Sequence, residues 1–463
     1  MTKIDLIQPR HNYAPAEGPG HIYMPTSLLT IAARLLDSGI DVKIFDENLN
    51  PYSGSSNIVG INLLGAPYIP EAIKLENKIK KNHPDAKFLL GGQVISGLDK
   101  PQFQKLFGAT AFNGNNDVVL DSTLGITNNL LKRAEKISLV PAYEKIDDGD
   151  MREYLKREIG LYVSQGCRYA CDFCPAVRTF KDPTTGVVKK VQEVYRDQSI
   201  IGADLNYLVE RAKNLGLKGL SIYMSNLDVF QTHGELAKFT AAARQVRENH
   251  PDFKIKFRGL STAESFVDLS RKHPKTIEDL VSVGFNTVGF GVDGMTPQVW
   301  NALHKGMNTE DKCIEAIRSA RQDFGITPEI LMVFGHMGVD NHDTMKLAYK
   351  FTVDMVDKYG AIPRPHVAKS FVPGNKGWKM SHNQEAIELM VQSPELFQAL
   401  DFTALPSRLT HRHKETKRLA TKYFLKICYL PSATTLFVKP ITPEMTLKQI
   451  EEVKKFNEGR YDH

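Results

Sequence analysis

Cysteine is scarce in this chain, with five among 463 residues. A sparse, odd number of cysteines does not describe a secreted domain held together by disulfides. Apolar runs are short as well, and none approaches the ~20 residues that a membrane-spanning helix needs. The first residues, MTKIDLIQPR, lack the basic segment followed by an apolar segment that marks a signal peptide. We therefore expect a protein of the reducing cytoplasm with no membrane partner.

A large excess of charge of one sign is also lacking. Lysine and arginine number 59 against 53 aspartate and glutamate residues, which gives a net charge of +6. So small an excess over this length does not predict a nucleic-acid partner, although it fits mild attraction of anionic ligands. The hydrophobic fraction of 42% and the charged fraction of 24% are ordinary for a globular protein. The length suggests about two or three domains.

The first 125 residues alternate between strand and helix patterns. Strand-like apolar segments at 3–8, 41–46, 58–64, 87–90 and 111–112 are interleaved with amphipathic helical segments at 26–38 and 70–82. Such alternation predicts an α/β fold with an open parallel sheet, which binds ligands beyond the carboxyl ends of its strands. The polar stretch 120–151 is interpreted as a connection.

A second alternating series begins near residue 160. The predicted strands are 161–164, 219–224, 255–258, 287–291, 330–334 and 365–371, and the helices are 204–215, 233–249, 276–283, 309–324 and 342–359. Several helices end at a glycine, as helix C-caps do: Gly216, Gly284, Gly325 and Gly360. Six strand–helix units are too few for a closed eight-fold barrel. The pattern favours an open six-unit barrel with its site at the carboxyl ends of the strands, followed from about residue 381 by a helical, basic tail.

Three of the five cysteines crowd into the segment QGCRYACDFCPA, directly after the first strand of the second series. The thiolates of Cys167, Cys171 and Cys174 can bind three irons of a cubane cluster and leave the fourth iron open to another ligand. The alternative is a structural zinc ion, but such sites need four ligands and only three are local. Cys313 and Cys428 lie in helical and apolar surroundings, which is typical of buried structural cysteine.

The spacing Cys-x3-Cys-x2-Cys, with Phe173 just before the last cysteine, resembles the radical S-adenosylmethionine (SAM) superfamily. The resemblance implies a [4Fe–4S] cluster on the three cysteines and SAM chelating the open iron. It further implies one-electron cleavage of SAM to a 5′-deoxyadenosyl radical, which abstracts a hydrogen atom from substrate. An external electron donor, such as flavodoxin or ferredoxin, is implied as a partner. Phe173 is implied to help hold the adenine.

Later segments resemble one large branch of this superfamily in their order along the chain. IYMSNLDVF stands where the superfamily usually has Gly-Gly-Glu, and KFRGLS, VGFGVDG and LHKGMN follow in the order of that branch. The resemblance implies contacts with the amino, carboxylate and ribose groups of SAM. The residues implied to make them are Ser225, Asn226, Arg258, Ser261, Gly291 and Asp293.

That branch commonly carries an N-terminal Rossmann-like domain that binds cobalamin, and residues 1–125 are similar to it. Asn62 and the pair Gly91 and Gly92 stand where the branch contacts the cobalamin nucleotide tail. Glycine there would let a bulky tail approach the backbone closely, although Gly-Gly after a strand is also an ordinary turn. The segment FDENLNP has no histidine where corrinoid proteins with a protein lower ligand place one. Base-off cobalamin without a histidine ligand is the expectation.

The resemblance therefore implies four regions: a cobalamin-binding-type domain at 1–135, a linker at 136–158, a partial (β/α)6 radical SAM barrel at 159–380 and a helical region at 381–463. The implied reaction is cobalamin-dependent methylation of an unactivated carbon in a small molecule. Two alternatives stay open. One is a radical SAM cyclase or rearrangement enzyme without methyl transfer, and the other is a non-catalytic iron–sulfur or corrinoid sensor.

Overall fold

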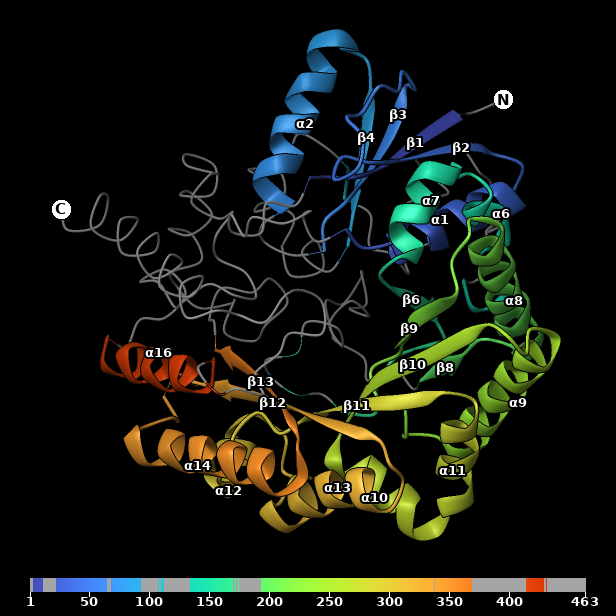
Figure 1. The fold of residues 1–463 in the computed structure, drawn as a ribbon. Coiled ribbons are helices and arrows are strands. Elements are labelled where there is room, and N and C mark those ends of the chain that lie inside the picture. The colour runs from blue at the N-terminus through green and yellow to red at the C-terminus, as the bar shows by residue number, and fades with distance from the viewer. Residues whose placement is uncertain are drawn as a thin grey trace.

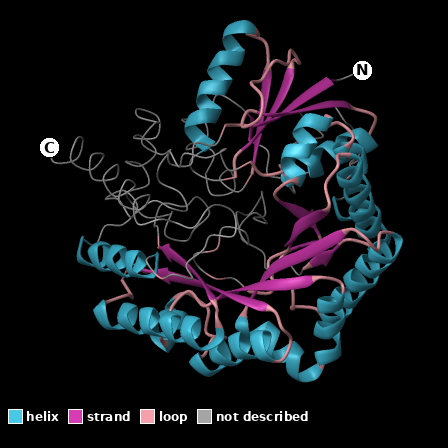
Figure 2. Cartoon of the chain, in the orientation of Figure 1, coloured by secondary structure: helices cyan, strands magenta, loops and turns pink. Residues whose placement is uncertain are grey.

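The structure is a computed structural model that describes residues 3–10, 22–64, 68–92, 107, 110–111, 134–169, 171, 174, 193–336, 338–368, 414–428 and 430. Within these ranges the chain forms two parallel sheets with flanking helices (Figure 1). Helices and strands alternate along most of the described chain (Figure 2). The prediction for Phe173 falls outside the described residues. So do most of the predicted tail and the last part of the strand predicted at 365–371.

The N-terminal sheet is parallel throughout and has the strand order β2-β1-β3-β4-β5. Its strands are β1 (Lys3–Gln8), β2 (Asp41–Asp46), β3 (Ile58–Asn62), β4 (Lys87–Gly91) and β5 (Thr110–Ala111), and its helices are α1 (Thr26–Asp37) and α2 (Tyr68–Asn82). The strand order reverses direction between β1 and β3, and in such doubly wound sheets that switch point forms the ligand crevice. The Rossmann-like fold predicted from the sequence is confirmed.

The connection between the two sheets is more structured than a polar linker. It contains a 3-10 turn η1 (Ala134–Lys136) and the helices α6 (Val140–Tyr143) and α7 (Asp148–Leu155). Asp147 caps α7, since its side chain accepts a hydrogen bond from the Asp150 amide. Tyr143 and Tyr154 are buried, so aromatic side chains pack this segment against its neighbours.

The second sheet has six parallel strands in the order β13-β12-β11-β10-β9-β6, with β6 and β13 as its edges. The strands are β6 (Glu158–Tyr162), β9 (Gly219–Ser225), β10 (Lys254–Ser261), β11 (Phe285–Gly291), β12 (Thr327–Phe334) and β13 (Ile362–Val367). A short antiparallel pair joins β7 (Ser164–Gln165), which follows β6 in sequence, to β8 (Val194–Tyr195). The open six-stranded barrel predicted from the sequence is confirmed.

Helices cover the outer face of this curved sheet (Figure 1). They are α8 (Gln198–Asn214), α9 (His233–Asn249), α10 (Ala263–Lys272), α11 (Pro274–Ser282), α12 (Pro297–Ala302), α13 (Glu310–Gln322) and α14 (His342–Tyr359), and α16 (Lys414–Cys428) packs against α14 and β13. The four glycines predicted as C-caps have positive φ angles, from 61° to 107°. The short helices α10 and α12 were not predicted, and each begins at a threonine whose side chain caps the first turn.

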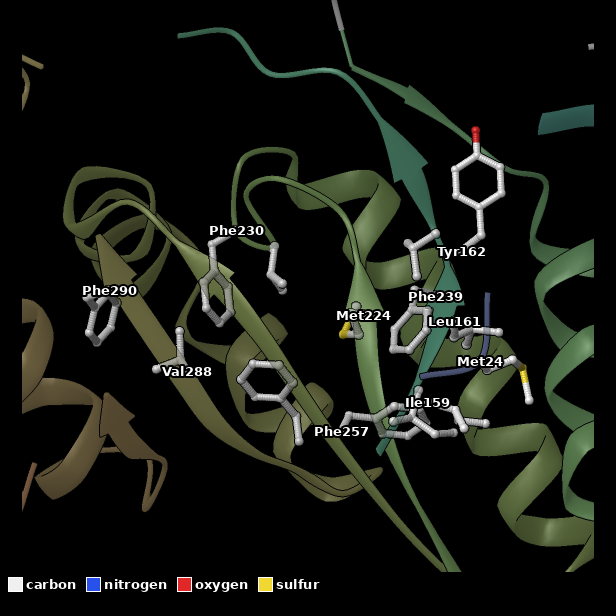
Figure 3. Packing of buried hydrophobic residues seen from close by; sticks show 14 of the residues in the cluster. Met24, Ile159, Leu161, Tyr162, Met224, Phe230, Phe239, Phe257, Val288 and Phe290 are labelled. Carbon is white, nitrogen blue, oxygen red and sulfur yellow. The ribbon is translucent and has the colours of Figure 1, made fainter. Parts of the chain in front are cut away.

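Alternation along the strands sends apolar side chains outward to these helices. Phe257 of β10 and Phe290 of β11 are fully buried in that layer, as Figure 3 shows for the central strands. The same core includes Met24, which lies beside Ile159 and Leu161 of β6 (Figure 3). Residues just before α1 therefore share a hydrophobic core with the first barrel strand.

Polar contacts also join the N-terminal sheet region to the barrel. The Thr26 hydroxyl donates to the carbonyl oxygen of Gly160 at 3.3 Å, and the Tyr154 hydroxyl donates to Asp46 at 2.8 Å. A side chain on Gly160 would place its Cβ 2.8 Å from the Ser225 hydroxyl and 3.0 Å from the Thr26 hydroxyl. A larger residue on β6 would therefore push against both hydroxyl groups. Among the described helices none is long and apolar enough to cross a membrane.

Candidate functional site

The cysteine loop begins directly after β7, at the carboxyl end of the first barrel strand. Gly166, with a φ of 109°, makes the turn, and the Tyr169 amide donates to the Cys167 sulfur at 3.4 Å. The Cys174 amide donates to the carbonyl oxygen of Cys171 at 3.1 Å. Burial raises the pKa of Cys167 to about 12 and that of Cys171 to about 11. Without a metal these thiols are neutral, and coordination would deprotonate them.

Within the described ranges, no three histidine, cysteine, aspartate or glutamate side chains are arranged to hold a metal ion. Cluster binding by the three cysteines stays a prediction from their spacing. Cys313 on α13 and Cys428 on α16 are both buried, as the sequence predicted for structural cysteines.

A buried carboxylate, Asp228, organises the loop after β9. It accepts hydrogen bonds from three hydroxyl groups at the end of β10 and the start of α10: Ser261 at 2.6 Å, Ser265 at 2.7 Å and Thr262 at 3.0 Å. Burial raises the pKa of Asp228. The Ser261 hydroxyl, which the sequence assigned to SAM, is therefore hydrogen-bonded within the protein. Its expected contact with SAM stays a prediction.

The same network anchors the first half of the cysteine loop. The Arg168 amide donates to the side-chain oxygen of Gln231 at 2.9 Å, and its guanidinium donates to the Ser265 hydroxyl at 2.8 Å. Gln231 also donates to Glu193, next to β8. The residue after Cys167 is thereby tied to the ends of three neighbouring elements.

Asn226 has no hydrogen-bond partner for either side-chain amide atom in the part of the chain that the structure describes. It follows β9 directly, and its side chain is 4% exposed. A buried amide without partners costs roughly 1–3 kcal/mol, so such groups usually meet a ligand or water. Its oxygen is an acceptor for an ammonium group and its nitrogen is a donor to a carboxylate, the two ends of an amino acid. The SAM contact expected for Asn226 stays a prediction.

Arg258 lies three residues before the end of β10, on the inner face of the barrel. Its guanidinium donates to Glu329 at 2.9 Å and to Glu158 at 3.2 Å, and Glu329 also accepts from Arg364 at 3.0 Å. Glu329 is fully buried. Arg258 thus belongs to an ion network inside the barrel, one layer below the strand ends. Its role in SAM binding stays a prediction.

The segment at the end of β11 is held by side chains from several elements. The Lys305 ammonium donates to the carbonyl oxygen of Gly291 at 2.6 Å and pairs with the Asp293 carboxylate. His336 contacts the Asp293 carbonyl oxygen through Nε2 at 2.7 Å. Asp293 has a φ of 56°, which is rare for a residue with a side chain. The structure thus brings Gly291 and Asp293 to the same strand edge as Asn226 and Ser225.

The carboxyl edge of the N-terminal sheet carries a second polar cluster, at the switch point between β1 and β3. The Asn62 amide nitrogen donates to the Gln8 side-chain oxygen at 2.8 Å and to the Ser27 hydroxyl at 3.0 Å. The Gln8 amide nitrogen, by contrast, has no partner within the described residues, although Gln8 is 3% exposed. Sequence reasoning missed Gln8. The feature that could have pointed to it is a polar residue at the end of the apolar strand KIDLIQ.

Gly92 is required by packing within the sheet. Its φ is 113°, and a Cβ there would lie 2.3 Å from the carbonyl oxygen of Leu63. Gly91 ends β4 and accepts a hydrogen bond from the Leu63 amide at 2.7 Å. The glycine pair therefore lets the end of β4 pack closely against the backbone that follows β3. This contact accounts for Gly92 without a ligand.

The polar side chains of the segment FDENLNP form hydrogen bonds with other residues of the protein. Asp46 accepts from the Tyr154 hydroxyl at 2.8 Å and from Asn48, and Asn48 also donates to the carbonyl oxygen of Pro9 at 3.2 Å. A side-chain oxygen of Glu47 accepts from the Tyr52 amide at 3.4 Å. Burial raises the pKa of Asp46. These contacts hold the loop after β2 against α7.

A polar cavity of about 1380 Å³ lies along α8, α9 and β8. Arg168, Glu193 and Gln231 line it and also belong to the network around the cysteine loop. Its other lining residues come mainly from the two helices, away from Asn226 and Asp293. We therefore place the reacting groups at the strand ends and not in this cavity.

Residues 161–348 match the family model for the radical SAM superfamily. They include the cysteine loop and the polar residues at the ends of β9, β10 and β11. This part of the chain is therefore a radical SAM domain, and such a domain implies a [4Fe–4S] cluster and SAM. No curated protein matches the sequence.

Solved structures with the same fold extend beyond this domain. One is the radical SAM methyltransferase TsrM from Kitasatospora setae, with tryptophan substrate and a SAM analogue bound. It is 15% identical in sequence, and the match covers 81% of this chain and 75% of that chain with a TM-score of 0.60. Another is the cobalamin-dependent SAM radical enzyme OxsB with aqua-cobalamin and SAM bound. It is 13% identical in sequence, and the match covers 99% of this chain and 62% of that chain with a TM-score of 0.59. At such identities the likeness shows a shared fold.

Proposed function

We propose that this chain is a cobalamin-dependent radical SAM methyltransferase that acts on an unactivated carbon of a small molecule. The observation that carries the proposal is the second polar edge. The radical SAM domain accounts for the cysteine loop and Asn226, but not for the buried Gln8 side chain at the switch point of a separate sheet, whose amide nitrogen has no partner among the described residues. A polar ligand at that edge would supply the partner, and solved structures of the same fold are of enzymes whose names or bound molecules include cobalamin.

When bound, the cofactors would supply one electron that cleaves SAM to a 5′-deoxyadenosyl radical and a carrier that relays a methyl group to carbon. The chain's own residues then have three tasks. Cys167, Cys171 and Cys174 hold the cluster, and Asn226 holds the amino acid end of SAM. Asp293, which pairs with Lys305 at the end of β11, would accept hydrogen bonds from a ribose.

At the N-terminal edge, Gln8 offers an amide donor to the nucleotide tail of cobalamin. Asn62 fixes the orientation of the Gln8 side chain, because the Asn62 amide nitrogen donates a hydrogen bond to the Gln8 side-chain oxygen. The contacts of Thr26 with Gly160 hold this edge in a fixed relation to the barrel. A fixed relation matters because reacting groups on two domains must meet at short range.

The substrate and the electron donor are part of the proposal. A small molecule fits the absence of a nucleic-acid charge pattern, and a low-potential donor such as flavodoxin or ferredoxin would supply the electron. A reducing cytoplasm as the place of the reaction is part of the same proposal.

The decisive experiment uses SAM with an isotopically labelled methyl group, under anaerobic conditions with candidate substrates. Label in the product, with both 5′-deoxyadenosine and S-adenosylhomocysteine formed, is the expected result. A rearranged, unlabelled product with only 5′-deoxyadenosine would instead establish the cyclase alternative.

Cobalamin binding is tested separately. The side chains of Asp46, Glu47 and Asn48 already have partners, which supports a base-off cofactor without a protein ligand from this loop. Electron paramagnetic resonance of the Co(II) protein should show no hyperfine splitting from an axial nitrogen. Splitting from a nitrogen would contradict the absence of a histidine ligand, and failure to bind any cobalamin would contradict the proposed use of the N-terminal sheet.

A further inference from the structure

The turn at the start of the cysteine loop is braced by a closed ring of hydrogen bonds. Ser164 of β7 precedes the turn at Gly166, and its hydroxyl donates to the Glu193 carboxylate. Glu193 also accepts from the side-chain nitrogen of Gln231, whose side-chain oxygen accepts from the Arg168 amide at 2.9 Å. The ring therefore starts two residues before the glycine and ends two residues after it. Because a carboxylate holds the amide nitrogen of Gln231, its oxygen is the atom that faces the loop.

The side chain of Arg168 holds the same turn from the barrel side. Its guanidinium donates to the Ser265 hydroxyl at 2.8 Å, and that hydroxyl donates to Asp228 at 2.7 Å. Ser265 and Asp228 are both buried. The guanidinium carbon also lies 4.9 Å from the centroid of the Tyr169 ring. A cation is thus linked to a buried carboxylate through one hydroxyl group, and this link fixes the side chain of the residue that follows Cys167.

The braced turn directs one backbone amide at a cysteine sulfur. The Tyr169 amide donates to Sγ of Cys167 at 3.4 Å. This N–H group lies in the same peptide plane as the carbonyl group of Arg168, so fixing Arg168 also restricts the direction of the N–H bond. Hydrogen bonds to sulfur are among the features that set the reduction potential of an iron–sulfur cluster. The reduced cluster carries one more negative charge, so an N–H dipole aimed at its ligand stabilises the reduced form.

We propose that Gln231 and Ser265 are positioning residues for the iron–sulfur cluster. They hold the backbone and the side chain of Arg168. The Tyr169 amide thereby stays directed at the Cys167 sulfur, and this hydrogen bond raises the reduction potential of the cluster. The inference rests on the cluster-binding part of the proposed function. The external electron donor supplies the one electron of the couple, and neither positioning residue gains or loses a proton.

Two substitutions release the turn without changing its net charge. Gln231→Leu removes the acceptor for the Arg168 amide, and Ser265→Ala removes the acceptor for the guanidinium. Each should make the potential more negative, because the hydrogen bond to the cysteine sulfur is weakened. A redox titration of the reconstituted protein without SAM, followed by electron paramagnetic resonance, measures the potential, and iron analysis measures cluster content. Negative shifts in both variants at unchanged iron content are the expected result.

The matched controls remove the same chemical groups at positions away from the turn. Gln245→Leu removes an amide that lines the polar cavity from α9. Ser270→Ala removes a hydroxyl of α10 that donates to the carbonyl oxygen of Val267. Both should leave the potential unchanged, and an equal shift in either control would overturn the proposal. A purely structural role predicts that the two turn variants lose iron while the remaining cluster keeps its potential, and that pattern would overturn it as well.

A measurement on the apoprotein keeps the proposal testable if a variant fails to bind a cluster. Amide hydrogen exchange of the peptide that contains Tyr169, followed by mass spectrometry, reports on the restriction of this turn. Exchange should be several times faster in Gln231→Leu than in the unmodified protein and unchanged in Gln245→Leu. Equal exchange in all three proteins would show that the ring does not brace the turn. If the unmodified protein bound no iron, the proposed function itself would fall, and this result is distinguishable because it needs no substitution.

Discussion

The carboxyl edges of the two sheets hold their polar groups in different ways. At the barrel edge, buried charges are fixed by dense networks: Asp228 by three hydroxyl groups and Asp293 by Lys305. At the N-terminal edge the buried groups are neutral amides, Gln8 and Asn62, in a short chain of hydrogen bonds. Fixed charges suit a site where charge moves, because they need no reorganisation during the reaction. Neutral amides suit recognition of a polar tail that does not react.

Among the substitutions that test this comparison of the two sheet edges, the largest loss of activity is expected in the cysteine loop. Replacing Cys171 by Ala should abolish the cluster and all reductive cleavage of SAM, because two thiolates cannot hold three irons. Iron analysis should fall from about four irons per chain, and 5′-deoxyadenosine should be undetectable. Cys313→Ala is the control and should keep both, since Cys313 is a buried residue of α13. Residual SAM cleavage by the Cys171 variant would refute the assignment.

A smaller effect is expected at Asn226. Its replacement by Leu should weaken SAM binding by about 1.5–3 kcal/mol, roughly 10- to 100-fold, because the amide would bind charged groups. In the absence of SAM the same variant should be at least as stable as the unmodified protein, since it removes a buried amide that has no partner among the described residues. Equilibrium dialysis and thermal unfolding give the two values. A destabilised variant with normal SAM affinity would show a structural role instead.

At the N-terminal edge the corresponding change is Gln8→Met. It should weaken cobalamin binding by about 0.5–1.5 kcal/mol, roughly two- to tenfold, because one neutral hydrogen bond is lost. SAM affinity should not change, so the two edges would respond independently. Absorbance titration measures cobalamin binding and equilibrium dialysis measures SAM binding, with the exposed Gln245→Met as control. Equal losses of SAM and cobalamin binding would mean that the edges form one site.

The smallest effect is on the pH dependence of stability. Burial raises the pKa of Asp46, so between its unfolded and folded pKa values the folded protein binds more protons than the unfolded chain. The free energy of unfolding should therefore fall as pH rises through that window. Asp46→Asn should make this part of the profile flatter. Urea unfolding at a series of acidic pH values is the measurement, and an unchanged slope would show that another group is responsible.

Local pattern was enough to place most elements of the fold. The segments 41–46, 233–249 and 342–359 were predicted with the bounds that the structure has, because hydrophobic periodicity and glycine C-caps are local properties. The helices α10 and α12 were missed because they are short and their apolar faces are only one or two turns long. The helices α6 and α7 were hidden in a stretch whose composition is polar.

The sequence by itself determined the chemistry of the cysteine loop, since three thiolates within eight residues are close whatever the rest of the chain does. It also determined the order of strands and helices. Only the tertiary structure decided which polar residues are free to bind ligands. Asn226 and Ser261 both stand at strand ends, but Ser261 donates to Asp228 while Asn226 has no partner within the described residues. Pairing depends on neighbours that are distant in sequence, such as Gln8 with Asn62 and Lys305 with Gly291. Register and packing bring such partners together, and no local pattern records them.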